Sequence, residues 1–104
     1  MWSGEEFPAI RTEAPVHFLY CISKYPTPLT DFHFRRVSFD RYDGFSDHSI
    51  GISAAFCALS RGAQILEKHF TLNRNDYGPD HAISMTPGDL AQLAKYKQEL
   101  SDML

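Results

Sequence analysis

Residues 44–72 read GFSDHSIGISAAFCALSRGAQILEKHFTL, and this stretch decides the predicted fold. Two short apolar segments, each followed by a histidine, flank a segment with helical character, and the histidines are His48 and His69. The interval between them suits a strand end, a helix and the next strand. Because parallel strands bring their carboxyl ends to the same edge of a sheet, we expect both imidazoles at one edge, well placed to share a metal.

The predicted helix lies between the two histidines. Ile52, Ala55, Phe56 and Leu59 fall on one helical face, and Gly62 follows where a C-terminal cap is expected. A second helix is predicted from residue 86 to about residue 100. Thr86 can cap it, with Pro87 in the first turn and Asp89 completing an acidic variant of the capping box; its marking residues are Leu90, Leu93, Tyr96, Lys97 and Leu100.

Two more segments predict strands. Residues 16–22 (VHFLYCI) form a nearly continuous apolar run, typical of a strand in a parallel sheet, and the prolines of 25–28 (YPTP) end it. Residues 64–72 predict the third strand with its exit. Residues 31–43 mix phenylalanines with charges, which favours a short helix or irregular turn over a full crossover helix. The alternation predicts an α/β fold with parallel strands.

Composition sets the broad class. The 104 residues can form at most one domain, 43% are hydrophobic and 22% charged, and the net charge is −3. These values suit a globular chain and give no reason to expect nucleic acid or an anionic membrane as a partner. We find no signal peptide and no apolar run of about 20 residues. Cys21 and Cys57 are interpreted as buried free thiols of a cytoplasmic protein.

Four motifs together resemble the sialic acid synthase (N-acetylneuraminate synthase) family. They are residues 21–28 (CISKYPTP), 44–51 (GFSDHSIG), 67–72 (EKHFTL) and 78–81 (GPDH), in the family's order and close to its spacing. The resemblance covers about residues 16–100. It implies the C-terminal part of a (β/α)8 TIM barrel, about the last three βα units, in residues 16–104, preceded by an arm or linker at 1–15.

A whole barrel of this kind needs about 250 residues. The sequence is therefore expected to be a fragment or a truncated product, inactive on its own. Three parallel strands leave two open edges and a bare inner face, which predicts self-association or a homodimer.

The resemblance also implies a reaction: condensation of phosphoenolpyruvate with N-acetylmannosamine or a related acetamido sugar, giving a nine-carbon 2-keto acid. His48 and His69 would hold a divalent metal, manganese or alternatively magnesium or cobalt. This metal would stabilise the negative charge that develops on the aldehyde oxygen of the sugar.

The remaining site residues carry over from the same resemblance. Ser23 and Ser46 would contact phosphoenolpyruvate, although Ser23 stands where many family members have asparagine. Tyr25, Glu67 and Asp80 would hydrogen-bond the sugar, and Glu67 or Asp80 would relay a proton as the catalytic group.

Two other functions fit part of the pattern. A metal-dependent hydrolase on an α/β scaffold would use His48 and His69 to activate water, and a non-catalytic remnant would bind metal weakly or act through association. The hydrolase hypothesis gives no role to the motifs at residues 25–28 and 78–80.

Several side chains have open interpretations. Asp47 either faces away from the site or orients one of the histidines, and Lys68 should point toward the helix layer or solvent. His81 either orients Asp80 or caps its loop, whereas His17 and His33 are taken as structural or surface residues. The phenylalanines of 32–45 are expected in the core. Arg35, Arg36 and Arg41 form either an anion patch or, by preference, a solvated face.

Overall fold

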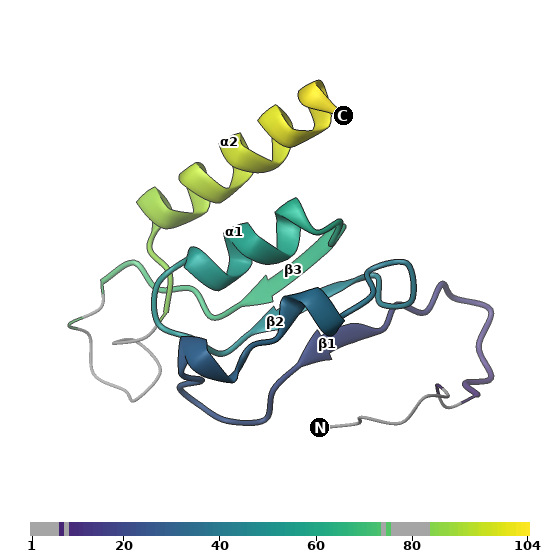
Figure 1. Ribbon diagram of the computed structural model, residues 1–104. Coiled ribbons are helices and arrows are strands. Elements are labelled where there is room, and N and C mark those ends of the chain that lie inside the picture. The colour runs from purple at the N-terminus through teal and green to yellow at the C-terminus, as the bar shows by residue number, and fades with distance from the viewer. Residues whose placement is uncertain (1–6, 8, 74, 76–83) are drawn as a thin grey trace.

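The fold was obtained as a computed structural model, which describes residues 7, 9–73, 75 and 84–104 (Figure 1). Three parallel strands alternate with two helices, as the sequence predicts. The elements in chain order are β1 (Leu19–Cys21), the 3-10 turns η1 (Leu29–Asp31) and η2 (Phe34–Arg36), β2 (Gly44–Asp47), α1 (Ser53–Ser60), β3 (Ile65–Lys68) and α2 (Pro87–Met103).

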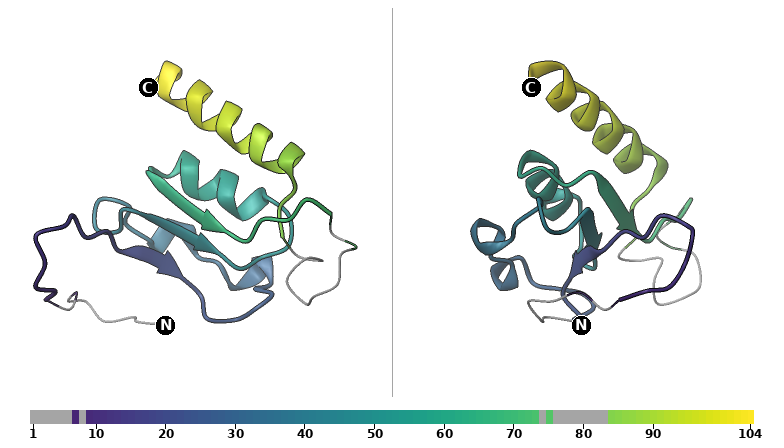
Figure 2. Two further views of the ribbon diagram at one scale, coloured as in Figure 1. Left: turned by 180° about the vertical axis from the view of Figure 1, so that it is seen from behind. Right: turned by 90° about the vertical axis from the view of Figure 1, so that its right-hand side faces the viewer.

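The sheet has the order β1-β2-β3, so β2 is paired on both sides. Cys21 lies beside Ser46, and Ser46 lies beside Glu67. Both helices lie on the same side of this sheet, with α2 stacked beyond α1 (Figures 1 and 2). Strand alternation therefore divides the side chains between a face covered by the helices and an opposite, open face.

The core lies between the sheet and α1. Phe45 is fully buried and packs in a cluster with Phe34, Ala54, Ala58 and Ala63. The small alanines of α1 allow the helix to approach the sheet closely, while the aromatic rings fill the remaining space. Phe32 and Phe39 are partly buried against this cluster, which confirms that the phenylalanine-rich segment forms core.

The second helix begins as its sequence predicts. Thr86 accepts a hydrogen bond from the Asp89 backbone, and the Asp89 side chain accepts one from the Thr86 backbone, so the capping box is complete. Leu93 is buried against α1, and Tyr96 packs on Phe56 with ring centroids 4.8 Å apart. This contact attaches α2 to α1.

The strands are shorter than predicted. Of the expected segments 16–22 and 64–72, only Leu19–Cys21 and Ile65–Lys68 form strands of the sheet. The physical reason is the central strand, because β2 spans only Gly44–Asp47 and limits what either neighbour can pair with. Residues 31–43 contain no regular crossover helix but the turn η2, in agreement with the predicted short helix or turn.

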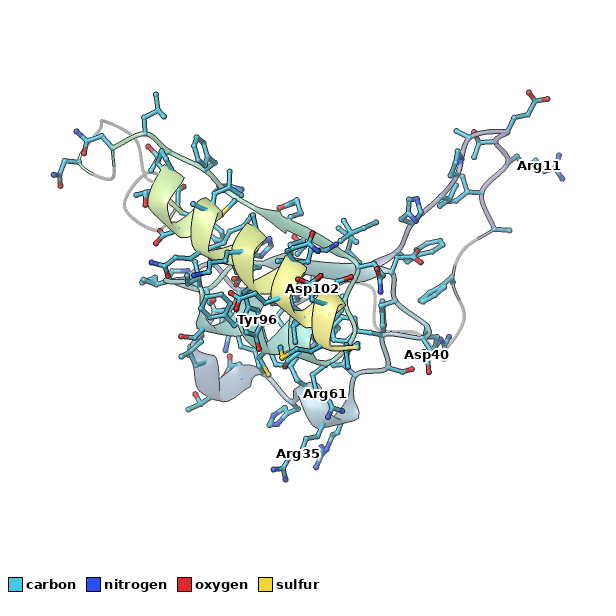
Figure 3. All side chains as sticks on the ribbon, turned by 90° about the horizontal axis from the view of Figure 1, so that it is seen from above. Arg11, Arg35, Asp40, Arg61, Tyr96 and Asp102 are labelled. Atoms are coloured by element: carbon cyan, nitrogen blue, oxygen red, sulfur yellow. The ribbon has the colours of Figure 1, made fainter. Side chains whose placement is uncertain are left out.

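One expectation about a surface residue needs correction, and one open alternative is decided by the structure. Both cysteines are free, but Cys21 is only half-buried and Cys57 is exposed, so the prediction of two buried thiols is wrong for Cys57. Cys57 lines an open cavity that α1 shares with the turns η1 and η2. Arg35, Arg36 and Arg41 are all exposed, in agreement with the solvated face that the sequence favoured over a single anion patch. Arg35 and Arg36 share an open cavity with Arg61, which lies on the same side as Arg35 in Figure 3, whereas the Arg41 guanidinium stands 5.0 Å from the ring centre of Phe7.

Within the part of the chain that the structure describes, none of the helices has the length and apolar character needed to cross a membrane.

Candidate functional site

The open face of the sheet carries a row of polar side chains. Cys21, Ser46 and Glu67 are register neighbours on the three strands. Their chain neighbours Tyr20, Phe45 and Leu66 belong to the core on the other face. Since side chains alternate along a strand, the next positions on the open face of β2 and β3 are His48 and His69. The two histidines therefore stand side by side at the carboxyl edge.

Four residues named from the sequence line one cavity of about 350 Å³: Ser23, Tyr25, His48 and His69. The loop after β1 carries the first two, and the ends of β2 and β3 carry the histidines. The Thr27 backbone N–H donates to the His48 carbonyl over 2.9 Å, which holds this loop against the end of β2. The structure thus brings these four residues together at the carboxyl edge of the sheet.

The hydrogen bond of His48 determines its tautomer. Its Nδ1 lies 3.0 Å from the carbonyl oxygen of Ile22. A carbonyl can only accept, so Nδ1 carries the hydrogen and the neutral ring keeps its lone pair on Nε2. In metalloproteins, a histidine that binds a metal through one ring nitrogen usually donates the hydrogen on its other nitrogen to a protein acceptor, and this bond orients the ring.

Tyr25 contacts both imidazoles. Its ring centre lies 5.0 Å from that of His48 and 5.1 Å from that of His69. The Tyr25 hydroxyl is 2.8 Å from Nδ1 of His69. When the hydroxyl accepts from Nδ1–H, the lone pair of the neutral His69 ring is on Nε2, as in His48.

By the chemistry of their donor atoms, these two imidazoles suit a divalent cation as a partial ligand set. Neutral imidazole nitrogens suit several divalent transition metals. Among the described residues, no group of three or more His, Cys, Asp or Glu side chains is arranged to hold a metal. Further ligands would have to be water, substrate oxygens or groups beyond the described part of the chain.

Asp47 and Lys68 lie on the other face of the sheet from the histidines. The Lys68 ammonium is 3.2 Å from a carboxylate oxygen of Asp47, and both side chains are buried. The other Asp47 oxygen accepts hydrogen bonds from Ser49. Of the two interpretations of Asp47, the structure supports the one in which it faces away from the site. Lys68 points toward the helix layer, as expected.

The remaining acidic and histidine candidates do not line this cavity in the described part of the chain. Asp80 and His81 lie outside the described residues. His17 is 3.4 Å from the Asp43 carboxylate at the surface, and His33 is exposed; neither lines the cavity with His48 and His69.

One residue beside the site was missed by sequence reasoning. The Cys21 sulfur lies 3.7 Å from both ring nitrogens of His48. Its position two residues before Ser23, on the same side of an alternating strand, was the available signal. Burial raises the pKa of the Cys21 thiol, as does the negative charge of Glu67, while a hydrogen bond from Ser46 acts in the opposite direction.

This environment predicts different reactivity for the two cysteines. We expect iodoacetamide at pH 7.5 to alkylate Cys57 well before Cys21, because the reactive species is the thiolate and Cys21 combines partial burial with a raised pKa. Mass spectrometry of peptides from a time course measures both rates. Equal rates would contradict the described environment of Cys21, and denatured protein, in which the two rates should converge, is the control.

Comparison with known proteins gives the chain its family. The model of the NeuB family matches residues 8–104. The chain is 36% identical over 83 residues to the N,N'-diacetyllegionaminic acid synthase of Campylobacter jejuni, covering 75% of this chain and 25% of that protein. It is 38% identical over 84 residues to human N-acetylneuraminate-9-phosphate synthase, covering 75% of this chain and 23% of that one.

A solved structure agrees with these matches. The crystal structure of N-acetylneuraminic acid synthetase from Leptospira borgpetersenii superposes with a TM-score of 0.73 at 33% identity, over 82% of this chain and 32% of that one. The predicted fold class, part of a TIM barrel with parallel strands, is thereby confirmed. The chain spans about a quarter of the length of the curated relatives it matches. It belongs to the NeuB family, whose members related to it include sialic acid and legionaminic acid synthases.

Proposed function

We propose that this chain supplies the metal and sugar part of a sialic acid synthase-type site. The reaction would join phosphoenolpyruvate to N-acetylmannosamine or a related acetamido sugar, giving a nine-carbon 2-keto acid and phosphate. Membership of the NeuB family supports the reaction class. The observation that carries the assignment to this part of the molecule is the cavity that His48 and His69 line together with Tyr25, whose ring contacts both imidazoles.

Polar groups of the cavity, Ser23 and Tyr25, and of the neighbouring sheet face, Ser46 and Glu67, would bind the two substrates. Hydroxyls of Ser23 and Ser46 would donate to the carboxylate or phosphate of phosphoenolpyruvate, since those anions accept hydrogen bonds. Tyr25 and Glu67 would bind hydroxyls or the amide of the sugar, together with Asp80. Glu67 or Asp80 would hold or move the proton.

His48 and His69 would hold a divalent cation, with manganese as the first choice and magnesium or cobalt as alternatives. The geometry supports this role through Nε2 of His48, which the bond to Ile22 leaves with its lone pair. When bound, the cation would supply Lewis acidity at the aldehyde oxygen.

The complete site would need more of the barrel than these 104 residues contain. The polar row on the open sheet face would then line the interior of a closed barrel. We therefore propose that the isolated chain binds metal but does not turn over substrate. Two free cysteines are consistent with the proposed cytoplasmic location.

Metal binding by the chain tests this proposal. We expect calorimetric titration with Mn²⁺ to show saturable binding that is lost when His48→Ala and His69→Ala are combined. The matched control is His33→Ala, which removes an exposed histidine outside the cavity and should leave binding unchanged. Binding that survives in the double variant would place the metal elsewhere and contradict the proposed site.

A further inference from the structure

A buried ion pair lies directly behind the two histidines. Asp47 precedes His48 and Lys68 precedes His69, and the two charged residues are register partners on β2 and β3. Their side chains are 0% and 3% exposed, and the ammonium lies 3.2 Å from the carboxylate. The pair thus connects the last paired positions of the two strands, one residue before each imidazole.

The same two side chains also hold the turn that follows β2. The Lys68 ammonium donates to the backbone carbonyl of Ser49 over 2.6 Å. One Asp47 oxygen accepts from the Ser49 backbone N–H at 2.8 Å and from its hydroxyl at 2.6 Å. His48 therefore lies between two residues that this network fixes, Asp47 and Ser49.

Stability alone is a poor explanation for such a pair. Removing two charges from water costs free energy that their attraction often does not recover, and apolar replacements of similar volume are often neutral or stabilising. The network instead fixes the relative position of two strands. It joins β3, an edge strand of the described sheet, to the central strand β2 at the last paired residues before His48 and His69.

We infer that Asp47 and Lys68 are positioning residues that fix the backbone on which His48 and His69 stand, and so the direction of both imidazoles. Neither side chain reaches the cavity; each acts through the residue that follows it in the chain. The consequence for a metal rests on the proposed function, whereas the consequence for ring orientation does not.

The test replaces the pair by apolar residues, with Asp47→Leu and Lys68→Met combined in the 104-residue chain. We expect the double variant to fold with a lower melting temperature than the unchanged chain, because no unpaired charge is left buried but the Ser49 N–H, hydroxyl and carbonyl lose their partners. In metal-free protein, the imidazole ¹H–¹³C signals of His48 and His69, assigned from their alanine variants, should shift or broaden while those of His17 and His33 stay in place. Mn²⁺ affinity should fall by about 10- to 100-fold.

Two controls separate positioning from general loss of structure. Leu93→Ala opens the buried contact of α2, so it should lower stability without moving the His48 and His69 signals. Lys68→Arg keeps a cation beside Asp47 and should retain most of the metal affinity of the unchanged chain.

The inference is overturned if the folded double variant keeps the His48 and His69 signals of the unchanged chain. Should the double variant not fold, Asp47→Asn, which preserves shape but removes the charge, is measured in the same way, and unchanged signals there overturn it equally. Failure of the unchanged chain to bind Mn²⁺ would count against the proposed function, while the metal-free signals still test the positioning role.

Discussion

Gly44→Ala should separate β2 from β3 and abolish the pairing that places the two histidines side by side. A Cβ at this position would lie 2.0 Å from the backbone oxygen of Ile65 and 2.7 Å from its carbonyl carbon. Backbone atoms of a paired strand cannot rotate away as a flexible side chain can, so the strands themselves must move. Overpacking commonly costs about 1–3 kcal/mol, and we expect at least the upper end of this range.

Urea unfolding followed by circular dichroism measures the effect as a lower midpoint. The matched control is Gly88→Ala in the first turn of α2. There the nearest atom to an added Cβ is the Thr86 hydroxyl at 3.9 Å, and alanine favours a helix. We expect this control to be as stable as the unchanged chain or more stable by up to about 1 kcal/mol. A Gly44→Ala midpoint equal to that of the unchanged chain would contradict the described approach of β2 to β3.

Phe45→Ala should have the largest effect of any substitution in the core, a loss of about 3–5 kcal/mol in the free energy of unfolding. Phe45 is fully buried, and its ring lies 5.2 Å from Phe34, 5.5 Å from Phe32 and 6.1 Å from Tyr20 between centroids. Truncation removes these contacts and leaves a cavity that the neighbouring rings, fixed on separate segments, can fill only in part.

The loss is large beside the total stability of a small domain, about 5–15 kcal/mol. Thermal unfolding and hydrogen exchange of β2 amides measure it. Leu72→Ala is the control, because that side chain is 78% exposed and its removal should change stability by less than about 0.5 kcal/mol. A Phe45→Ala variant as stable as this control would show that the described core does not hold the sheet.

What the sequence determines is mostly local. Thr86 and Asp89 bond to each other's backbone within one turn, so the start of α2 could be predicted without any knowledge of the rest of the chain. The placement of His48 and His69 at one edge could also be predicted, because it follows from parallel pairing, whatever the register. The periodicity of residues 52–59 indicated one apolar face of α1, but that face packs mainly on α2. The residues of α1 that pack on the sheet are Ala54 and Ala58, which the sequence marked only as good helix formers.

Tertiary structure decided the features that depend on distant partners. The length of β1 depends on where β2 begins and ends, and the exposure of Cys57 depends on how the turns η1 and η2 lie beside α1. The tautomer of His48 depends on the carbonyl of Ile22, a backbone atom that no residue type reveals. The partner of Asp47 depends on the β2–β3 register, because a neighbouring register would place another side chain beside it. The sequence by itself thus determined which groups reach the carboxyl edge, through local periodicity and parallel pairing, whereas only the folded chain decided which atoms hold them there.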